Sequence, residues 1–567
     1  MLRDQSIRPT RPFFEAIALL RSRCMTQHDL IVLSRYANSA RRSCLPLVAS
    51  PPMTSTTAAR LLTGLSLLFP AAAAMASLPV AHCRKGDRVE TGITGWTTPE
   101  EIASGKAAQG FNCNVDIVGQ YQGEGASWQL TAWKNCAYFD QRRTPAPTNP
   151  GTVAVDVTDE TRPTPTAWLA ENAMLDPWES LKVNPQRQLL AAAEMGQNGI
   201  AIYDISADCK HPALKAAKPL TGNIGHTGQW APDGKTYYVT PLRPSPSVIP
   251  VDTSDPADPK IIPCGKDTPG CNDSGFYVNP NPGTYSQVVH DLEFSKDGNT
   301  AYLAGTSPNG LILLDVSDFQ QRRPNPGFRI IGSIAWADGS RGAQNALPVT
   351  IKGKPYILFT DESGAQASGC SAGLSPNGFP RLIDISDPKN PKTVAKIQLD
   401  VHDPAYCTQV GSTPVTPTGP SFGFSCHYCN VDDADNAKIA ACSCFAAGWR
   451  FFDISEPTSP REIAYLKPAA QGTKLLPGSQ YATRAPPPFV RNYDWATSKA
   501  SFPKDRGMTS GNIWLTNQDN GFLVVKLAPE ATATGGGGCA SAGAGLAGLM
   551  ALGAVQLLRR RRRRSKG

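Results

Sequence analysis

The stretch "PRLIDISDPKNPK", residues 380–392, joins a short apolar segment, an aspartate and a proline-rich turn. The same pattern recurs around Asp156, Asp204, Asp252, Asp315, Asp384 and Asp453, and a seventh copy, "GFLVVKLAPE", carries Lys526 in place of the aspartate. Consecutive copies are 48, 48, 63, 69, 69 and 73 residues apart. Because the core of the unit is constant while its spacing varies, the pattern indicates a structural repeat with loops of different length.

Each copy supplies four or five apolar residues, mostly β-branched or aromatic, which is typical of a strand covered on both faces. The Asp/Ser/Pro cluster that follows ends the strand and turns the chain. A second signal precedes several copies: "HTGQWAPDGKTYYVT" (226–240) and "HDLEFSKDGNTAYLAG" (290–305) run through Asp-Gly into an aromatic strand, as a tight hairpin does. A hairpin, the repeat strand and one strand after the turn make four strands per unit.

Seven four-stranded units predict an all-β fold, a seven-bladed β-propeller over residues 112–528. We expect the blades at 112–158, 164–206, 214–254, 259–317, 327–386, 393–455 and 462–528. In this division "VDIVGQY" (115–121) opens the first blade and "GFLVVKL" (521–527) ends the last, so the ring closes side by side, without strand exchange. The fifth blade has a shortened hairpin at 345–362.

The repeated L-x-D-I-S-D-P-x-x-P, with H-D-x-x-x-S-x-D-G before it, resembles the LVIVD-repeat family of bacterial surface propellers over about 420 residues. The resemblance implies a propeller displayed outside the cell. That family is defined by its repeats and has no common activity, so the resemblance implies a fold more than a function.

The two ends carry export signals. Residues 53–76 have one Arg, an apolar run and an A-x-A site, as a secretory signal peptide does. Residues 1–52 before it are either an over-extended reading frame or a disordered leader, and residues 77–111 form an N-terminal extension of the propeller.

The C-terminal end consists of a Gly-rich linker (529–538) and a tail (539–567) with Cys539, an apolar stretch at 540–558 and six arginines. That stretch is long enough for a transmembrane helix, with the arginines left in the cytoplasm. The layout resembles MYXO-CTERM and GlyGly-CTERM sorting tails, which implies a sorting protease and Cys539 as the sorting or lipid-attachment residue. A plain single-span membrane anchor is the alternative.

The net charge of +8 comes from the two ends. Removing residues 1–52, the signal peptide and the tail removes 16 basic and 3 acidic residues, and leaves 39 basic and 44 acidic residues, a net charge of −5. This balance excludes a nucleic-acid partner by charge. An unknown surface ligand or protein is the partner we expect.

Twelve cysteines remain in residues 77–538, and disulfides are the default for an even number in an exported protein. We suggest the local pairs Cys113 with Cys136, Cys264 with Cys271, and Cys370 with Cys407. The segment 425–445 contains Cys426, Cys429, Cys442 and Cys444 in C-x2-C-x12-C-x-C spacing. This spacing suits a tetrathiolate zinc site in the cytosol, and disulfides in an exported chain.

Three of the seven histidines share one repeat position: His226 and His290 stand seven residues before an Asp-Gly, and His427 nearly the same distance before Asp435-Asn436. Trp178 takes this position in the second blade. Because equivalent positions form a ring around a propeller axis, the histidines could converge on a transition metal, with His402 as a fourth ligand. Asp291, Glu293 and Asp403 are candidates for carboxylates around that site. The alternatives are that the histidines only bond neighbouring backbone, or that they line a metal-free pocket.

Two functions follow. The first is a surface propeller that binds a ligand or partner and catalyses nothing, with Trp178, His226, His290 and His427 lining its site. The second is an extracytoplasmic metal-dependent enzyme, an oxidase or hydrolase, which resembles in broad architecture the selenium-binding-protein type of methanethiol oxidase. No Walker loop, nucleophile elbow or H-E-x-x-H motif is present, which favours the first.

Overall fold

The structure is a computed structural model. It describes residues 78–141, 148–222, 224–242, 248–265, 268, 271, 288–306, 309–338, 342–365, 367–410, 422–469 and 494–532. The predicted leader, the signal peptide, Cys539 and the apolar stretch at 540–558 lie outside these residues. Within them, no helix is long and apolar enough to cross a membrane.

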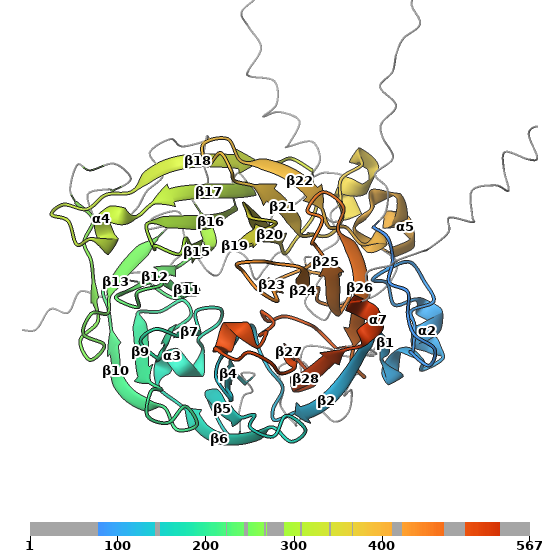
Figure 1. Ribbon diagram of the computed structural model, residues 1–567, viewed down its shortest axis with the longest axis horizontal. Helices are drawn as coiled ribbons and strands as arrows, with labels where there is room; N and C mark the ends of the chain where they lie inside the picture. Colours follow the sequence, from blue (N-terminus) through green and yellow to red (C-terminus); the bar gives the residue numbers. More distant parts are fainter. Residues whose placement is uncertain are drawn as a thin grey trace, which may run out of the picture. The chain divides into compact units, whose positions relative to one another are not determined.

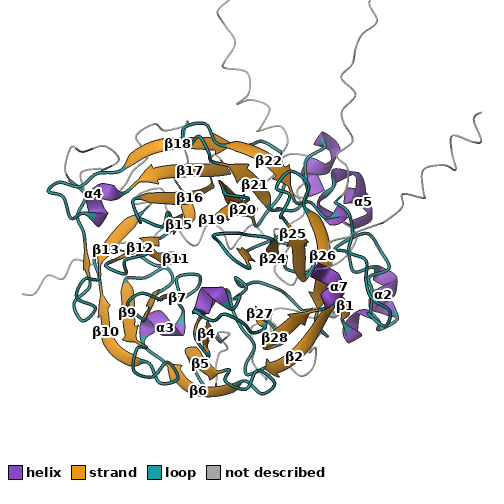
Figure 2. Cartoon of the chain, in the orientation of Figure 1, coloured by secondary structure: helices purple, strands orange, loops and turns teal. Residues whose placement is uncertain are grey.

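The described residues form seven antiparallel sheets that follow one another around a central axis (Figures 1 and 2). The predicted seven-bladed all-β propeller is therefore confirmed. The α-helices of the described part are short: α2 (Pro99–Ala103), α3 (Asn172–Leu175), α4 (Ser317–Gln320), α5 (Cys407–Val410) and α7 (Pro529–Thr532). Short 3-10 turns occupy Ala107–Gln109, Ala367–Ala372, Asp400–His402, Pro404–Tyr406 and Lys504–Arg506.

Each blade begins with the strand nearest the axis (Figure 1). Blade 1 contains β3 (Leu130–Trp133), β4 (Cys136–Asp140), β5 (Thr152–Asp156) and β6 (Thr164–Leu169); blade 2 contains β7 (Lys182–Asn184), β8 (Leu189–Ala193), β9 (Gly199–Asp204) and β10 (Ala213–Pro219). Blade 3 contains β11 (Thr227–Trp230), β12 (Thr236–Thr240), β13 (Ile249–Asp252) and β14 (Lys260–Ile261); blade 4 contains β15 (Val289–Phe294), β16 (Thr300–Thr306), β17 (Asn309–Asp315) and β18 (Arg329–Ala335). Blade 5 contains β19 (Ala343–Ile351), β20 (Lys354–Asp361), β21 (Arg381–Asp384) and β22 (Lys392–Lys396); blade 6 contains β23 (Cys429–Val431), β24 (Ile439–Ser443), β25 (Trp449–Asp453) and β26 (Arg461–Lys467), with β1 (Phe111–Cys113) added outside β26.

Blade 7 is completed by strand exchange, which corrects the side-by-side closure expected from the sequence. Its strands β27 (Ile513–Asn517) and β28 (Gly521–Leu527) are followed outward by β2 (Val115–Tyr121) from the N-terminal side of the propeller. The blade limits are also wrong by one strand, because the strand after each Asp-Pro turn pairs with the repeat strand before it, as β6 pairs with β5. Exchange removes the open edge that side-by-side closure would leave on β28.

The repeat aspartates fix the turns, as the sequence suggested. In blades 1 to 6 the third strand ends at the repeat aspartate, whose Oδ1 accepts the backbone N–H two residues further on at 2.8–3.0 Å. This local bond offers the backbone an alternative to the sheet ladder and so ends the strand.

The repeat strand is buried on both faces because each face packs on a different blade. Leu382 belongs to the cluster that includes Val431 and Phe452 of blade 6, whereas its neighbour Ile383 packs with Leu311 and Leu313 of blade 4. Successive side chains of a strand point to opposite faces, so this pattern gives a continuous apolar run.

The fifth blade was expected to have a shortened hairpin, and this expectation is wrong. Strands β19 and β20 have nine and eight residues and are the longest neighbouring pair in the described chain. They are joined by Lys352 and Gly353 alone, whose φ values of 50° and 76° suit the two-residue turn that the right-handed strand twist favours.

The twelve cysteines of the described chain form six disulfides: Cys83–Cys113, Cys136–Cys209, Cys264–Cys271, Cys370–Cys407, Cys426–Cys444 and Cys429–Cys442. Two of the three suggested pairs are confirmed. The pair Cys113–Cys136 is wrong, because β1 lies on blade 6 while β4 belongs to blade 1. The cysteines of the C-x2-C-x12-C-x-C segment are oxidised in pairs, so they make no zinc site. Six disulfides point to an extracytoplasmic location.

A group of buried ions fastens the N-terminal extension to blade 6. Glu90 lies between Arg450 and Lys467, with its Oε1 2.5 Å from Arg450 Nη2 and 2.5 Å from Lys467 Nζ, and Arg450 Nη1 lies 3.0 Å from Glu462 Oε1. We refer to these four residues as the blade-6 ion cluster. Its side chains are at most 5% exposed, and it contains two cations and two anions.

Candidate metal centre

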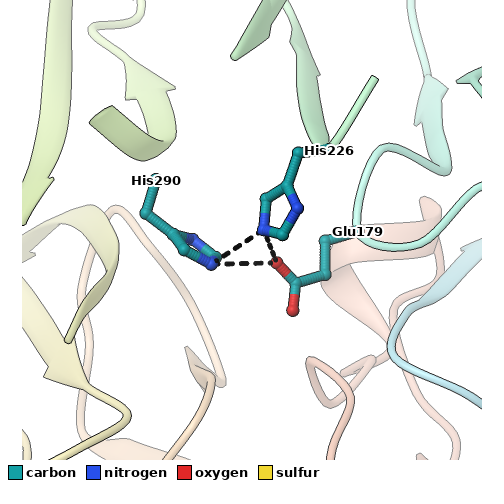
Figure 3. Close-up of side chains that lie close together, drawn as sticks. All are labelled: Glu179, His226 and His290. Atoms are coloured by element: carbon teal, nitrogen blue, oxygen red, sulfur yellow. Dashed lines mark hydrogen bonds and ion pairs between the residues drawn. The ribbon is translucent and has the colours of Figure 1, made fainter. Parts of the chain in front are cut away.

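Three histidines and one glutamate converge near the axis from four blades. His226 precedes β11, His290 is the second residue of β15, His427 precedes β23, and Glu179 precedes β7. All four side chains are at most 6% exposed. Figure 3 shows Nε2 of His226 and Nε2 of His290 directed at one carboxylate oxygen of Glu179. We refer to Glu179, His226, His290 and His427, together with Glu362, as the axial cluster.

The distances within the axial cluster are those of groups that share a small ion. The Nε2 atoms of His226 and His290 are 3.1 Å apart. Glu179 Oε2 lies 3.6 Å from His226 Nε2 and 3.4 Å from His290 Nε2, and Glu179 Oε1 lies 2.9 Å from His427 Nε2. Ligand atoms of Glu179, His226 and His290 fall within 4.8 Å of one another. The cluster therefore presents nitrogen and oxygen lone pairs to one point.

Glu362 adds a second carboxylate from blade 5, which has no histidine. Its Oε2 lies 3.6 Å from His427 Nε2 and its Oε1 lies 3.9 Å from His290 Nε2. Gly342, just before β19, makes room for it: a Cβ at Gly342 would lie 2.8 Å from Cγ of Glu362 and 2.5 Å from Oγ of Ser363. The lack of a side chain at 342 thus lets the carboxylate approach from the end of β20.

The second ring nitrogen of two histidines has a contact that fixes the ring. His427 donates its Nδ1–H to the backbone oxygen of Thr497, which directs Nε2 into the cluster toward Glu179 Oε1. Nδ1 of His226 lies 3.3 Å from Sδ of Met195. A metal-binding histidine is usually held in this way, with its outer nitrogen bonded to a carbonyl or another group of the protein.

Burial and mutual charge set the ionisation of the cluster. Burial, with the nearby His290, lowers the pKa of His226 to about 3, and burial likewise lowers the pKa of His290. For Glu179, burial raises the pKa but the imidazoles of His290 and His427 outweigh it and hold the pKa far below its usual range. Burial raises the pKa of Glu362 to about 8. Two neutral imidazoles beside an ionised carboxylate are a donor set suited to a divalent metal.

A layer of paired polar groups lies next to the axial cluster. Tyr428 donates its hydroxyl hydrogen bond to Asp291 over 3.1 Å, and Asn345 donates to the same carboxylate over 3.1 Å. Lys499 donates to Glu293 over 2.6 Å. Asp291 and Glu293, which the sequence offered as carboxylates around the site, both belong to this layer.

The other candidates lie elsewhere. His402 is buried, but both ring nitrogens are bonded to backbone: Leu399 N–H donates to Nδ1, and Nε2–H donates to Phe424 O over 2.9 Å. As placed, His402 has no nitrogen for a metal, so it is not the fourth ligand. Asp403 instead caps a 3-10 turn by accepting the N–H of Ala405. Trp178 lies next to the cluster, with its ring centroid 6.0 Å from that of His226, but the residue that enters the cluster is Glu179.

Sequence reasoning missed Glu179 and Glu362. Glu179, and not Trp178, holds the repeat position of blade 2: it stands five residues before Asn184, which closes the inner hairpin with Leu189. His290 likewise stands five residues before Ser295, which bonds Thr300 at the end of its hairpin. A signal for it was present, since a polar residue follows three positions later in each case: Lys182 after Glu179, and Glu293 after His290. Glu362 lies on a different strand end from the histidines, and no local pattern marks it.

Comparison with known proteins finds distant structural similarity alone. No protein-family pattern matches the chain, and no curated protein matches it. Among solved structures, the Cps50 (Swd1) β-propeller domain of Myceliophteria thermophila aligns with 72% of this chain and 98% of its own at 11% identity and a TM-score of 0.43. The periplasmic gluconolactonase of Pseudomonas aeruginosa aligns over 62% and 94%, at 13% identity and 0.41. Kuenenia stuttgartiensis hydrazine synthase aligns over 72% and 96%, at 11% identity and 0.41.

Proposed function

We propose that this chain is an extracytoplasmic propeller that binds one transition-metal ion on its axis and uses it as a metal-dependent enzyme, an oxidase or a hydrolase. His226, His290, His427 and Glu179 would hold the ion, with Glu362 as a further carboxylate. The observation that carries the proposal is the convergence of three imidazole nitrogens and Glu179 in a buried space, where Oε2 of Glu179 has no hydrogen-bond partner among the described residues.

The donor set supports catalysis more than storage. Three imidazoles with a carboxylate resemble the His-rich sets of catalytic zinc and of non-haem iron, which keep a coordination position for water or substrate. When bound, such an ion would polarise a substrate or activate water. The chain's own residues would orient the His427 ligand, because the Thr497 carbonyl holds its ring.

Without a metal, the same rings would serve the binding function that the sequence favoured, a non-catalytic surface module of the LVIVD-repeat type. Its ligand would be a surface molecule or protein partner. The buried ring nitrogens and carboxylate oxygens argue against a non-catalytic binding module. A buried polar group without a partner costs free energy, and a binding module would not need such groups.

The ends complete the proposal. A signal peptide at 53–76 would export the chain, and the tail after Cys539 would place it at the membrane, either as an anchor or as a substrate of a sorting protease. The six disulfides agree with export but do not choose between these fates.

The test is total metal content of the protein purified from an oxidising compartment without chelator. We expect about one equivalent of a transition metal per chain in the wild type, and less than about a tenth in Glu179→Gln and in the His226→Ala, His290→Ala double variant. The control is His402→Gln, a buried histidine outside the cluster, which should keep its metal. A metal-free wild type that also fails to take up zinc, iron, copper or manganese would refute the proposal.

A further inference from the structure

Two tryptophans stand where the buried axial cluster meets the surface. The ring of Trp128 lies 5.5 Å from that of His427, and the ring of Trp178 lies 6.0 Å from that of His226. The two indoles are 5.0 Å apart. Both are partly exposed, whereas the histidines behind them are at most 6% exposed. A molecule reaching the ligands from this side would touch the indoles.

The backbone of Trp178 is strained, and the strain places its ring. A φ of 49° is rare for any bulky side chain, and a position in this conformation favours Gly or Asn. The fold alone therefore gives no reason for an indole at 178. The following residue is tied down, since Glu179 N–H donates to the His226 carbonyl over 3.2 Å, so the same turn delivers Glu179 to the cluster and the indole to its edge.

Trp128 is backed by further rings, which makes the surface stiff. Phe422 and Phe445 each have their centroid 6.4 Å from that of Trp128, and they are 5.1 Å from each other. Phe445 also lies 5.0 Å from the His427 ring. We call Trp128, Trp178, Phe422 and Phe445 the aromatic wall. It joins residues from blades 1, 2 and 6 with the segment before blade 6.

The aromatic wall is apolar, and its indole faces favour ligands that contain a flat aromatic ring. Within the described chain, no lysine or arginine lies over either indole, although such contacts occur at Trp336 and Trp514. Indoles of this kind bind aromatic ligands by offset stacking, and cations by their ring faces. A cationic ligand here would sit beside the positive metal ion, so the neutral or anionic aromatic ligand is the favoured occupant.

We propose that the site takes an aromatic substrate, whose ring lies against Trp128 and Trp178 while an oxygen donor attached to that ring completes the coordination of the metal. This inference rests on the proposed metal centre. It names Trp128 and Trp178 as specificity residues: the metal would bind the oxygen in any small ligand, and the indoles would favour the one that carries a ring.

The experiment compares two metal-binding probes that differ mainly by a ring, benzohydroxamate and acetohydroxamate. Their dissociation constants are measured by calorimetry on the metal-loaded full chain, and on Trp178→Asn and Trp128→Leu. Asparagine tolerates the left-handed backbone at 178, so Glu179 keeps its place. Trp128 belongs to another blade, so its variant leaves the Glu179 segment intact. Metal content is determined in every sample.

We expect the wild type to bind benzohydroxamate at least about tenfold more tightly than acetohydroxamate, and the ratio to fall to about threefold or less in both variants with metal content unchanged. Trp178→Phe should recover part of the ratio. A metal-loaded wild type with equal affinities, or a preference that survives both substitutions, would overturn the aromatic-substrate inference while leaving the metal centre standing. A wild type that binds no metal would overturn the proposed function itself.

Discussion

The axial cluster and the blade-6 ion cluster are both buried groups of ionisable side chains, yet they are built on opposite plans. The blade-6 ion cluster matches two carboxylates with two cations, and Lys467 also donates to Gly95 O and Thr97 Oγ1, each over 3.0 Å. In the described part of the chain, the carboxylates of the axial cluster have ion-pair contacts with histidines alone.

We infer from this difference that the blade-6 ion cluster serves stability and the axial cluster serves function. Burying a charge is costly unless an opposite charge and hydrogen bonds accompany it, and the blade-6 ion cluster supplies both. The axial cluster gathers groups whose charged forms would repel one another: two imidazole nitrogens 3.1 Å apart, and two carboxyl groups near one histidine. A buried cluster of this kind marks a candidate functional site, where a bound cation would supply the missing positive charge. The predictions below test this division, from the largest expected effect to the smallest.

The largest effect should come from removing a cation of the blade-6 ion cluster. Arg450→Ala leaves Glu90 and Glu462 buried with one fewer partner, so we expect the free energy of unfolding to fall by about 3–5 kcal/mol. Denaturant unfolding measures it. The matched control is Arg461→Ala, whose pair with Asp453 is 37% and 22% exposed and should cost less than about 1 kcal/mol. Equal losses in the two variants would contradict the structural role.

The sequence predicted the fold well because the repeat signal is local. Each aspartate ends a strand through a bond to a residue two positions away, so the pattern is readable without knowing what the strand packs against. The closure was not readable in the same way. The pairing of Ile117 with Val525 joins residues about 400 positions apart, and nothing in either strand states its partner.

The histidines of the candidate site could be predicted from the repeat, whereas its two glutamates could not. His226, His290 and His427 share a repeat position, and rotation around the axis brings equal positions together. Glu179 was missed because the inner hairpin of blade 2 has no Asp-Gly from which to count, so Trp178 was assigned to the repeat position. Glu362 was missed because it approaches the histidines through the space that the missing side chain of Gly342 leaves. A sequence pattern does not show such a space.

The second prediction concerns acid stability. Burial raises the pKa of Glu90, but Arg450 and Lys467 outweigh burial and hold that pKa below 4.5. A carboxylate with a lowered folded-state pKa stabilises the fold above its unfolded pKa and loses this contribution as the pH falls through the folded value. The stability difference between wild type and Glu90→Gln should therefore shrink as the pH falls below about 4.5, by up to about 1.4 kcal/mol per pH unit.

Unfolding by denaturant at a series of pH values measures this difference. Glu462→Gln is the matched comparison, because burial raises the pKa of Glu462, so its contribution has the opposite sign and is lost as the pH rises. A Glu90→Gln difference that stays constant down to pH 3 would show that the arginine and lysine do not hold the charge on Glu90.

The smallest effect, and the most specific, should come from filling the space at Gly342. In Gly342→Ala the new Cβ would lie 2.8 Å from Cγ of Glu362, so the flexible glutamate must withdraw from His427 while the blade itself is little disturbed. We expect metal affinity to fall by about three- to tenfold, as when a supporting group of a metal site is displaced, with unfolding free energy of the metal-free protein changed by less than about 1 kcal/mol.

Metal competition titrations measure the metal affinity, and denaturant unfolding measures the free energy of unfolding. The effect on metal affinity should vanish when Gly342→Ala is made in a Glu362→Ala background, because the methyl group then displaces only Ser363, which is outside the axial cluster. If Gly342→Ala still lowers the affinity by the same factor in that background, then Gly342 does not act through Glu362, and the proposed role of this glycine in the axial cluster is wrong.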